Sequence, residues 1–411
     1  MREVGRMSKA LYYEDAWMRA FDARVSDAKQ DQDGVWLCLD RTAFYPEGGG
    51  QPGDSGRLLS GDREWLVADT RRDPEGCIWH LLSAQDGAAP PDIGTQVHGE
   101  VDWARRFDHM QQHTGEHIIA ASLFEVTGGF THGLHIGHEV STIDVTLPNG
   151  ATKLDAQALE RIEALANARI AADGPVVCSV PDSKELAGLP LRKDPTVTEQ
   201  VRICAIGDYE MVACAGTHLS HTSQVGLVKL LKSEPARGKM RLYFLCGERA
   251  MKHYALVYKA ITQVAEMLSA RVEEAPQLLR EQLDKAVQAR RELAALRRQN
   301  TLRKAPGLLA EAQALSDNRR LVIAELEEHD LPAMEALANV ITQQERVIVL
   351  LCAPKDGRRN LLFARSADLD TNMSDFIKST GAKGGGRPDF ARGACEESLP
   401  WEAARVMAPH L

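Results

Sequence analysis

Two short patterns, far apart in the chain, carry four side chains suited to holding a metal ion. The first contains His113 and His117, and the second, Cys-Ala-Gly-Thr-His, contains Cys214 and His218. Imidazole and thiolate ligands favour zinc over iron or calcium. Pairs so distant predict a metal site inside a globular domain rather than a small zinc finger. Four protein ligands are typical of structural zinc, because catalytic zinc usually keeps one position for water, so ligand count alone favours a structural ion.

The first pattern also reads His-x-x-Glu-His, the inverted motif of some zinc proteases. In such an enzyme Glu116 would be the general base, a carboxylate would be the third ligand and water the fourth. Cys214 and His218 would fill both remaining positions, which argues against a protease. We therefore expect Glu116 to be a solvent-facing helix residue.

A helix must position the first pair. Asp108 is suited to be its N-cap, with Gln111 as the capping-box partner. Gly128-Gly129 is suited to end it. A helix over this stretch sets His113 and His117 one turn apart on the same face, where both can reach one ion.

The second pair follows a predicted hairpin. Residues 201–213 read as two strands that turn at Gly207-Asp208, and Gly216 disfavours a helix directly after them. The hairpin would therefore deliver Cys214 to a loop.

The chain has 411 residues, 44% of them hydrophobic and 26% charged, which is too long for one ordinary core and typical of globular proteins. We predict an α+β multidomain protein. Its expected parts are a β-barrel-like domain with a glycine-rich loop (1–106), an α+β zinc-binding domain (107–250), a helical linker or dimerisation arm (251–316) and a small α/β domain (317–411).

The cell compartment follows from what the sequence lacks. No apolar run approaches the roughly 20 residues of a membrane span, and the first residues have no apolar core of a secretory signal. The eight cysteines are too sparse for a disulfide scaffold, and free thiolate ligands need a reducing environment. We expect a cytoplasmic protein with no membrane partner.

The formal net charge of −9 argues mildly against a nucleic-acid partner, but local clusters matter more than the total. Two runs are basic, one between Arg290 and Lys304 and the other between Lys229 and Arg241. Each run could bind phosphate or could be an ordinary solvated face, and the sequence favours neither interpretation.

Three motifs follow one another in an order that indicates a family: Gly-Gly-Gln-Pro-Gly-Asp at 49–54, then the His-x-x-x-His and Cys-x-Gly-Thr-His patterns. With them, the chain resembles the editing domain of alanyl-tRNA synthetase and its free-standing relatives, the AlaX trans-editing proteins. The segment 381–390 resembles the glycine-rich end of the synthetase's C-terminal domain, which DHH phosphoesterases share. Because no aminoacylation module precedes these motifs, we expect the long free-standing form.

The resemblance implies a trans-acting, zinc-dependent deacylase that hydrolyses serine, and also glycine, from tRNA for alanine. A synthetase pocket cannot strongly reject an amino acid that only adds a hydroxyl or is smaller, so a second site must hydrolyse the errors. One zinc ion per chain would be held by His113, His117, Cys214 and His218.

The resemblance also suggests further site residues. Gln51 matches the glutamine of the glycine loop, a pocket-lining position, and Thr131 matches a hydroxyl-bearing residue that helps recognise serine. Thr42 is an additional pocket candidate, and the helical region is a candidate homodimer contact. The candidates for contacting tRNA in the tail are Lys383, Arg387 and Arg392, which could equally be ordinary surface charges.

Several nearby residues fall outside the motifs. His132, His135 and His138 are expected to be surface residues on a turn. Ala215 stands where the family usually has glycine, at a position that could require unusual backbone angles.

Two other classes of function stay open. One is an RNA-binding module with structural zinc and no turnover. The other is a Cys-His hydrolase with Cys214 as the nucleophile.

Overall fold

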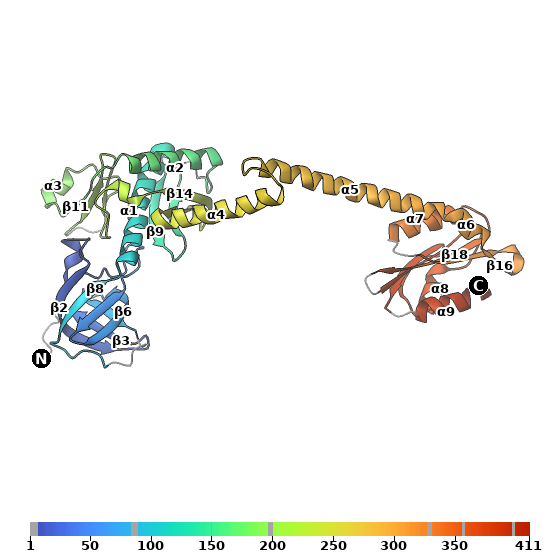
Figure 1. The fold of residues 1–411 in the computed structure, drawn as a ribbon, viewed down its shortest axis with the longest axis horizontal. Helices are drawn as coiled ribbons and strands as arrows, with labels where there is room; N and C mark the ends of the chain where they lie inside the picture. The colour runs from blue at the N-terminus through green and yellow to red at the C-terminus, as the bar shows by residue number, and fades with distance from the viewer. Residues whose placement is uncertain are drawn as a thin grey trace. The chain divides into compact units, whose positions relative to one another are not determined.

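The computed structural model describes residues 7–83, 89–148, 150–195, 200–326, 331–355, 358–396 and 399–411. The chain divides into two compact units, Met1–Ala260 and Ile261–Leu411, each with its own secondary structure (Figure 1). The predicted α+β multidomain class is confirmed. The finer division at residues 106, 250 and 316 stays a prediction.

The N-terminal part of the first unit is a closed barrel, as the sequence predicted. Its strands show the two-residue alternation of a barrel wall: in β2, Phe21, Ala23 and Val25 are buried, and the residues between them are exposed. A short parallel pair, β1 (Lys9–Ala10) and β4 (Arg41–Thr42), precedes the glycine loop. The barrel strands, in order around it, are β2 (Ala20–Gln30), β3 (Val35–Leu39), β7 (Ile78–Leu82), β6 (Arg63–Arg72), β5 (Gly56–Ser60) and β8 (Gln96–Val101).

Helix α1 (Trp103–Thr127) follows the barrel directly and carries the first ligand pair. Its N-cap is Asp102, whose side chain accepts a hydrogen bond from Arg105 N, so the prediction of Asp108 as N-cap is wrong. The helix begins earlier because Trp103 packs against Trp17, a long-range contact that the local pattern does not reveal. Its end is as predicted.

At that end, Gly128 has φ 70°, the left-handed conformation that favours glycine, and its N–H donates to Phe124 O.

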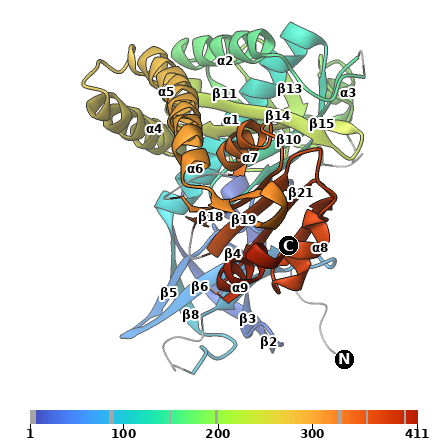
Figure 2. The same cartoon turned by 90° about the vertical axis from the view of Figure 1, so that its right-hand side faces the viewer.

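A four-stranded antiparallel sheet packs against α1 and completes the core of this half of the unit. Helix α2 (Ala156–Ala171) lies along α1 and β14 (Figures 1 and 2). The buried cluster between them includes Ile118, Ile143 and Phe244. The strands, in sheet order, are β14 (Val228–Ala236), β15 (Lys239–Cys246), β10 (Ser141–Thr146) and β9 (Phe130–Ile136).

A smaller sheet of three strands presents the second ligand pair. The hairpin of β12 (Ile203–Ile206) and β13 (Glu210–Ala213) turns at Gly207 and Asp208, as predicted, and β11 (Val176–Ser179) pairs with β12. The short helix α3 (Ser183–Ala187) follows β11.

The predicted helical region consists of three helices: α4 (Gly247–Met267), α5 (Ala275–Arg303) and α6 (Ala305–Ala310). Pro276 lies in the first turn of α5, where its missing N–H costs no hydrogen bond. No helix among the described residues has the length and apolar character needed to span a membrane.

The last part of the second unit is a six-stranded sheet covered on both faces. Helices α8 (Met373–Ser379) and α9 (Leu399–Met407) pack on one face, and α6 and α7 (Leu331–Ile341) on the other. The strands in order are β16 (Gln313–Ala314), β17 (Arg320–Glu325), β18 (Val347–Lys355), β19 (Arg358–Arg365), β21 (Phe390–Cys395) and β20 (Lys383–Arg387).

The tail glycines belong to this sheet. A Cβ at Gly384 would lie 2.3 Å from Arg392 O, and one at Gly386 would lie 2.2 Å from Phe390 O. The glycines therefore permit β20 to approach β21 closely.

Candidate metal centre and its pocket

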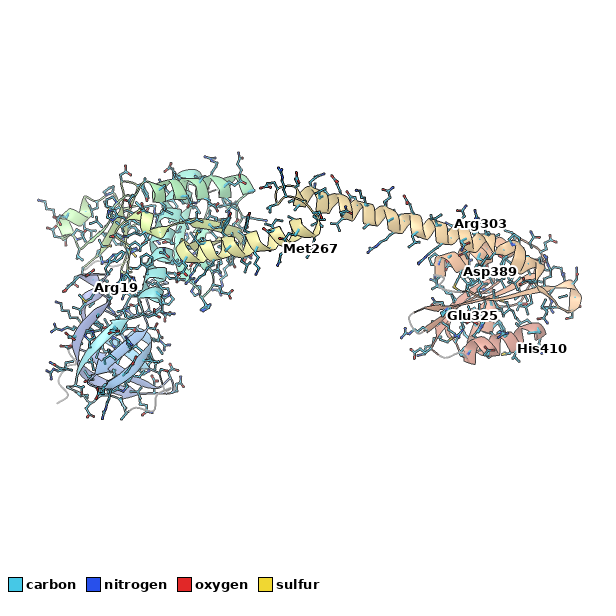
Figure 3. All side chains as sticks on the ribbon, viewed as in Figure 1. Arg19, Met267, Arg303, Glu325, Asp389 and His410 are labelled. Carbon is cyan, nitrogen blue, oxygen red and sulfur yellow. The ribbon has the colours of Figure 1, made fainter. Side chains whose placement is uncertain are left out.

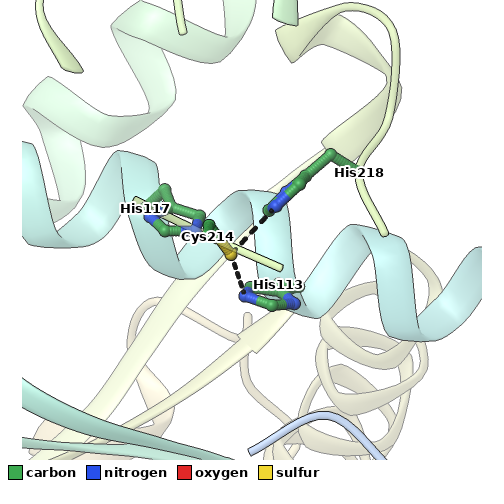
Figure 4. Close-up of side chains that lie close together, drawn as sticks. All are labelled: His113, His117, Cys214 and His218. Atoms are coloured by element: carbon green, nitrogen blue, oxygen red, sulfur yellow. Dashed lines mark hydrogen bonds between the residues drawn. The ribbon is translucent and has the colours of Figure 1, made fainter. Parts of the chain in front are cut away.

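The structure brings all four predicted metal ligands together (Figure 4). His113 and His117 lie one turn apart on α1, and Cys214 and His218 come from the loop after β13. The Sγ of Cys214 is 3.3 Å from Nε2 of His113 and 3.2 Å from Nε2 of His218. The ligand atoms of the four residues all lie within 4.8 Å of one another, close enough to share one ion.

The ring of His117 provides a test of whether a metal fits. Both of its nitrogens are buried, and neither has a hydrogen-bond partner among the described residues. Leaving buried polar atoms unsatisfied is unfavourable, and coordination of an ion by one nitrogen would relieve part of that penalty. Three imidazoles and one thiolate are a typical zinc set, so the residues fit the ion that the sequence predicted.

Gly216 lies in the loop that carries Cys214 and His218, directly against the ring of His113. A Cβ at this position would lie 2.1 Å from Cε1 of His113, so any side chain would displace the ligand ring. Ala215 is not among the described residues with positive φ, and its methyl group therefore requires no unusual backbone angle. Arg202 holds the same loop by donating from Nη1 to Cys214 O and Gly216 O.

A second group of potential ligands lies beside the first. The ligand atoms of Cys178, Cys204 and His218 also lie within 4.8 Å of one another. This group has only three members, and Nε2 of the shared His218 faces Cys214. The four-residue group is therefore the better-formed metal site.

Gln51 lies behind a ligand. Its Oε1 is 2.8 Å from Nδ1 of His113, and its Nε2 donates to Thr217 Oγ1 at 2.8 Å. Because the amide oxygen can only accept, Nδ1 carries the proton and Nε2 keeps its lone pair for the metal. Gln51 is fully buried and orients His113, while its neighbours Gly49 and Gly50 line the pocket.

The glycine loop is tied to the sheet at this point. Ile136 N donates to Gly50 O at 2.9 Å. Gly50 has φ 84°, and a Cβ there would lie 1.9 Å from Leu134 O. Only glycine allows this approach between the barrel loop and β9.

The pocket itself has a volume of about 440 Å³. Its wall includes three of the metal ligands and Thr131, the predicted serine-recognition residue. Its remaining lining comes from Glu116 on α1, the glycine loop, β9, the loop at Arg192 and the segment from Val212 to Gly216. His132 also lines the pocket, whereas His135 and His138 lie outside it. All three are exposed, as expected, but His132 and His135 belong to strand β9, so their prediction as turn residues is wrong.

Thr42 is not in the lining of this pocket. It is fully buried in the barrel, where its Oγ1 lies 2.9 Å from Nε2 of His80 and accepts from Phe44 N at 3.1 Å. Burial lowers the pKa of His80 to about 4, so this ring stays neutral at ordinary pH.

Two buried carboxylates stand next to the metal ligands. Glu116 is 6% exposed, so the expectation that it faces solvent is wrong. Its Oε2 lies 3.7 Å from Nδ1 of His117, and Oε1 of Glu210 lies 3.8 Å from the same nitrogen. Glu210 was not predicted, although its place two residues before buried Val212 puts it on the inward face of β13.

Arg192 compensates the charge of Glu210. Its Nε and Nη2 donate to the carboxylate at 2.7 and 2.8 Å, and its Nη1 is 3.5 Å from Thr131 Oγ1. Burial opposes ionisation of Glu210, but His117 and Arg192 outweigh it and hold its pKa below the usual value.

The ligands influence one another in the same way. Burial opposes ionisation of the Cys214 thiol, but the three histidines outweigh it and hold its pKa well below the usual value. Burial lowers the pKa of His218 to about 3 despite the nearby thiolate. In His117, burial is outweighed by Glu116 and Cys214, which raise its pKa well above the usual value.

The tail candidates lie in the second unit. Lys383 and Arg387 are exposed on β20, and Arg387 lies 3.4 Å from Asp389. Arg392 on β21 is exposed and pairs with Glu335 at 3.1 Å.

Comparison with known families points to one kind of protein. The family model described as tRNA synthetases class II (A) matches residues 1–105. The model of the threonyl and alanyl tRNA synthetase second additional domain matches residues 201–243, which contain Cys214 and His218.

Individual relatives agree with the family models. The chain is 32% identical to the alanyl-tRNA editing protein AlaX-L of Pyrococcus horikoshii, over 95% of each chain. It is also 32% identical to the alanine–tRNA ligase of Pyrobaculum neutrophilum, over 95% of this chain but only 44% of the ligase. The solved C-Ala domain of Aquifex aeolicus alanyl-tRNA synthetase overlaps 24% of this chain and 95% of its own, at 21% identity and a TM-score of 0.23, too low to support an argument.

Proposed function

This chain belongs to the AlaX-L family of alanyl-tRNA editing proteins and is an aminoacyl-tRNA deacylase, and we propose that it removes serine, and also glycine, from tRNA for alanine. The observation that carries the substrate proposal is the pocket of about 440 Å³, which combines His113, His117 and Cys214 with the hydroxyl of Thr131. In the reaction, water adds to the ester carbonyl, the bond to the ribose oxygen breaks, and that oxygen takes up a proton.

We further propose one zinc ion per chain, held by His113, His117, Cys214 and His218. The unsatisfied nitrogens of His117 and the mixed imidazole–thiolate set support this assignment. When bound, the ion would supply a fixed positive charge beside the ester group of the substrate.

Four residues of the chain have further proposed roles in binding the substrate or positioning a ligand. Thr131 offers a hydroxyl to that of serine, a contact that alanine cannot make. Nη1 of Arg192 lies 3.5 Å from Thr131 Oγ1, close enough to donate to this hydroxyl. Glu116 puts a carboxylate on the pocket wall, which complements the ammonium group of an aminoacyl ester. Gln51 keeps the ring of His113 in one orientation.

The decisive experiment compares hydrolysis of tRNA for alanine charged with serine, glycine or alanine. We expect release of serine and glycine with alanine retained, and loss of all release in His113→Ala. His98→Ala, which changes a half-exposed histidine of β8, should behave as wild type. A wild-type protein that binds the tRNA yet leaves all three esters intact would favour the RNA-binding module without turnover.

The metal proposal is tested by metal analysis and alkylation. We expect about one zinc per chain and a Cys214 that iodoacetamide modifies only after chelation. A zinc-free protein whose Cys214 reacts at once, and whose activity is lost with it, would favour the Cys-His hydrolase.

The remaining contacts to tRNA are proposed for the tail. Lys383 is the better candidate because Arg387 already pairs with Asp389 and Arg392 with Glu335. A homodimer through the helical region is proposed on the exposed leucines Leu279 and Leu283 at the start of α5. Sedimentation of wild type and of Leu279→Gln/Leu283→Gln tests that contact.

A further inference from the structure

The second half of α5 is strongly basic within an acidic chain. The segment from Lys285 to Lys304, here named the basic arm, contains one acidic residue, Glu292. The formal net charge of the whole chain is −9. The seven cations of the arm are Lys285, Arg290, Arg291, Arg297, Arg298, Arg303 and Lys304.

These cations are exposed and uncompensated. All seven side chains are solvent-exposed, and within the described parts of the chain none of them forms an ion pair with a carboxylate. Figure 3 shows side chains projecting from α5 along its length, with Arg303 labelled at its end. Their charge is therefore available to a partner.

The other basic run behaves differently. Three of its five cations are each matched by a nearby acid, whereas Arg237 and Lys239 form no ion pair within the described residues, so most of this run is neutralised. The pairs are Lys229 with Glu163, Lys232 with Glu234, and Arg241 with Asp144. The structure thus separates two runs that look alike in sequence.

The cations of the basic arm form rows along the helix. Arg290, Arg297 and Lys304 follow one another at seven-residue intervals, which is close to two turns and about 10.5 Å. Arg291 and Arg298 form a neighbouring row with the same interval. A linear array of this kind matches a polymer with regularly spaced negative charge better than a single small anion.

The row that contains Arg290 and Arg297 argues against dimerisation of two copies of the chain through this half of α5. Arg290 and Arg297 lie on the seven-residue row that continues from the exposed Leu283. Two such helices side by side in parallel would set each arginine opposite its own copy, and like charges in contact are unfavourable. A phosphate backbone meets no such repulsion, and arginine binds phosphate with two parallel hydrogen bonds.

We infer that the basic arm binds the sugar–phosphate backbone of the tRNA substrate. The identity of the RNA rests on the proposed function, whereas the charge pattern of the arm stands without it. The arm would contribute affinity and leave the chemistry at the metal centre unchanged.

The test measures binding of uncharged tRNA for alanine to the full chain as salt is varied. The variant Arg290→Gln/Arg297→Gln/Lys304→Gln should bind at least about tenfold more weakly at low salt, and the slope of log affinity against log salt should fall by about 2 to 3. Arg290→Lys/Arg297→Lys should keep the salt dependence of wild type, because it keeps the charges, and should lose less affinity than the glutamine variant. The matched control, Arg63→Gln/Lys153→Gln/Arg161→Gln, removes three exposed cations elsewhere and should bind as wild type.

Two results would overturn the inference. One is a triple variant with unchanged tRNA affinity and an altered oligomeric state, which would make the arm a contact between copies. The other is an equal loss in the control, which would mean that only total charge matters. Because the ligand is uncharged tRNA, failure of the proposed deacylation leaves this readout intact. Circular dichroism of each variant checks that α5 still forms.

Discussion

Gln51 and His113 are joined by a contact of 2.8 Å between Oε1 and Nδ1, so a loop of the barrel orients a ring on helix α1. The two residues come from different parts of the sequence and meet where neither is exposed. The amide decides which nitrogen of the ring carries the proton. The metal centre therefore depends on three parts of the chain: the barrel loop, helix α1 and the loop that follows β13.

Gln51→Ala should weaken zinc binding by about 10- to 100-fold, because His113 loses the partner that fixes its tautomer and orientation. Competition with a chromophoric chelator measures the affinity. Gln282→Ala, on the exposed face of α5, is the matched control. Equal zinc affinity in the two variants would contradict the assigned role of Gln51.

Gly216→Ala should abolish tight zinc binding, with a loss on the order of 100-fold, because the new Cβ would overlap the ring of His113. Ala215→Gly removes a methyl group at the adjacent residue instead of adding one, and this variant should still bind zinc. Zinc content after dialysis measures both. Full occupancy in Gly216→Ala would show that the loop can move aside.

Thr131→Val should slow release of serine by about tenfold and leave release of glycine unchanged, because one neutral hydrogen bond to the serine hydroxyl is lost. The ratio of the two rates on tRNA for alanine is the informative quantity. If both rates fell together, Thr131 would have a structural part and no part in recognition.

Removing Arg192 should destabilise the first unit by about 3 to 5 kcal/mol, because Arg192→Met leaves the buried carboxylate of Glu210 without its partner. Urea unfolding measures the change. Lys229→Met, which breaks the exposed pair with Glu163, should change stability by less than about 1 kcal/mol. The double variant Arg192→Met/Glu210→Gln should recover much of the lost free energy of unfolding. If it does not, the unpaired carboxylate of Glu210 is not the cause of the destabilisation.

Acid should destabilise the barrel through His80. The pKa of this buried ring is lowered to about 4, so below its ordinary value of 6.5 the unfolded chain takes up a proton that the folded chain does not. Stability is therefore lost as pH falls, by about 2 to 3 kcal/mol between roughly pH 7 and pH 4.5. Urea unfolding at several pH values measures this loss. His80→Gln should reduce the loss of stability at low pH, whereas His98→Gln should leave it as in wild type.

The sequence predicted what depends on neighbours along the chain. The spacing of His113 and His117, the end of α1 at Gly128 and the hairpin before Cys214 all follow from local geometry, and the structure has each of them. The family was predicted from the order of the motifs along the chain, because no single motif is specific enough to indicate it.

What depends on distant contacts was missed. The start of α1 at Trp103 reflects packing on Trp17, which nothing in the adjacent residues signals. Glu116 was expected in solvent because rejecting the zinc-protease motif left it without a role in the site. It is buried because the strand that carries Glu210 covers that side of the helix.

Beside the glycine loop, Asp54 and Arg106 form an ion pair in which both side chains are buried. A charge stranded there could not be hydrated, so the barrel loop and the first turn of α1 need each other in order to fold. A fragment that begins at residue 107 would lack Arg106, the loop and the partner of His113. Protein engineers who wish to move the metal site to another scaffold must therefore move the barrel with it.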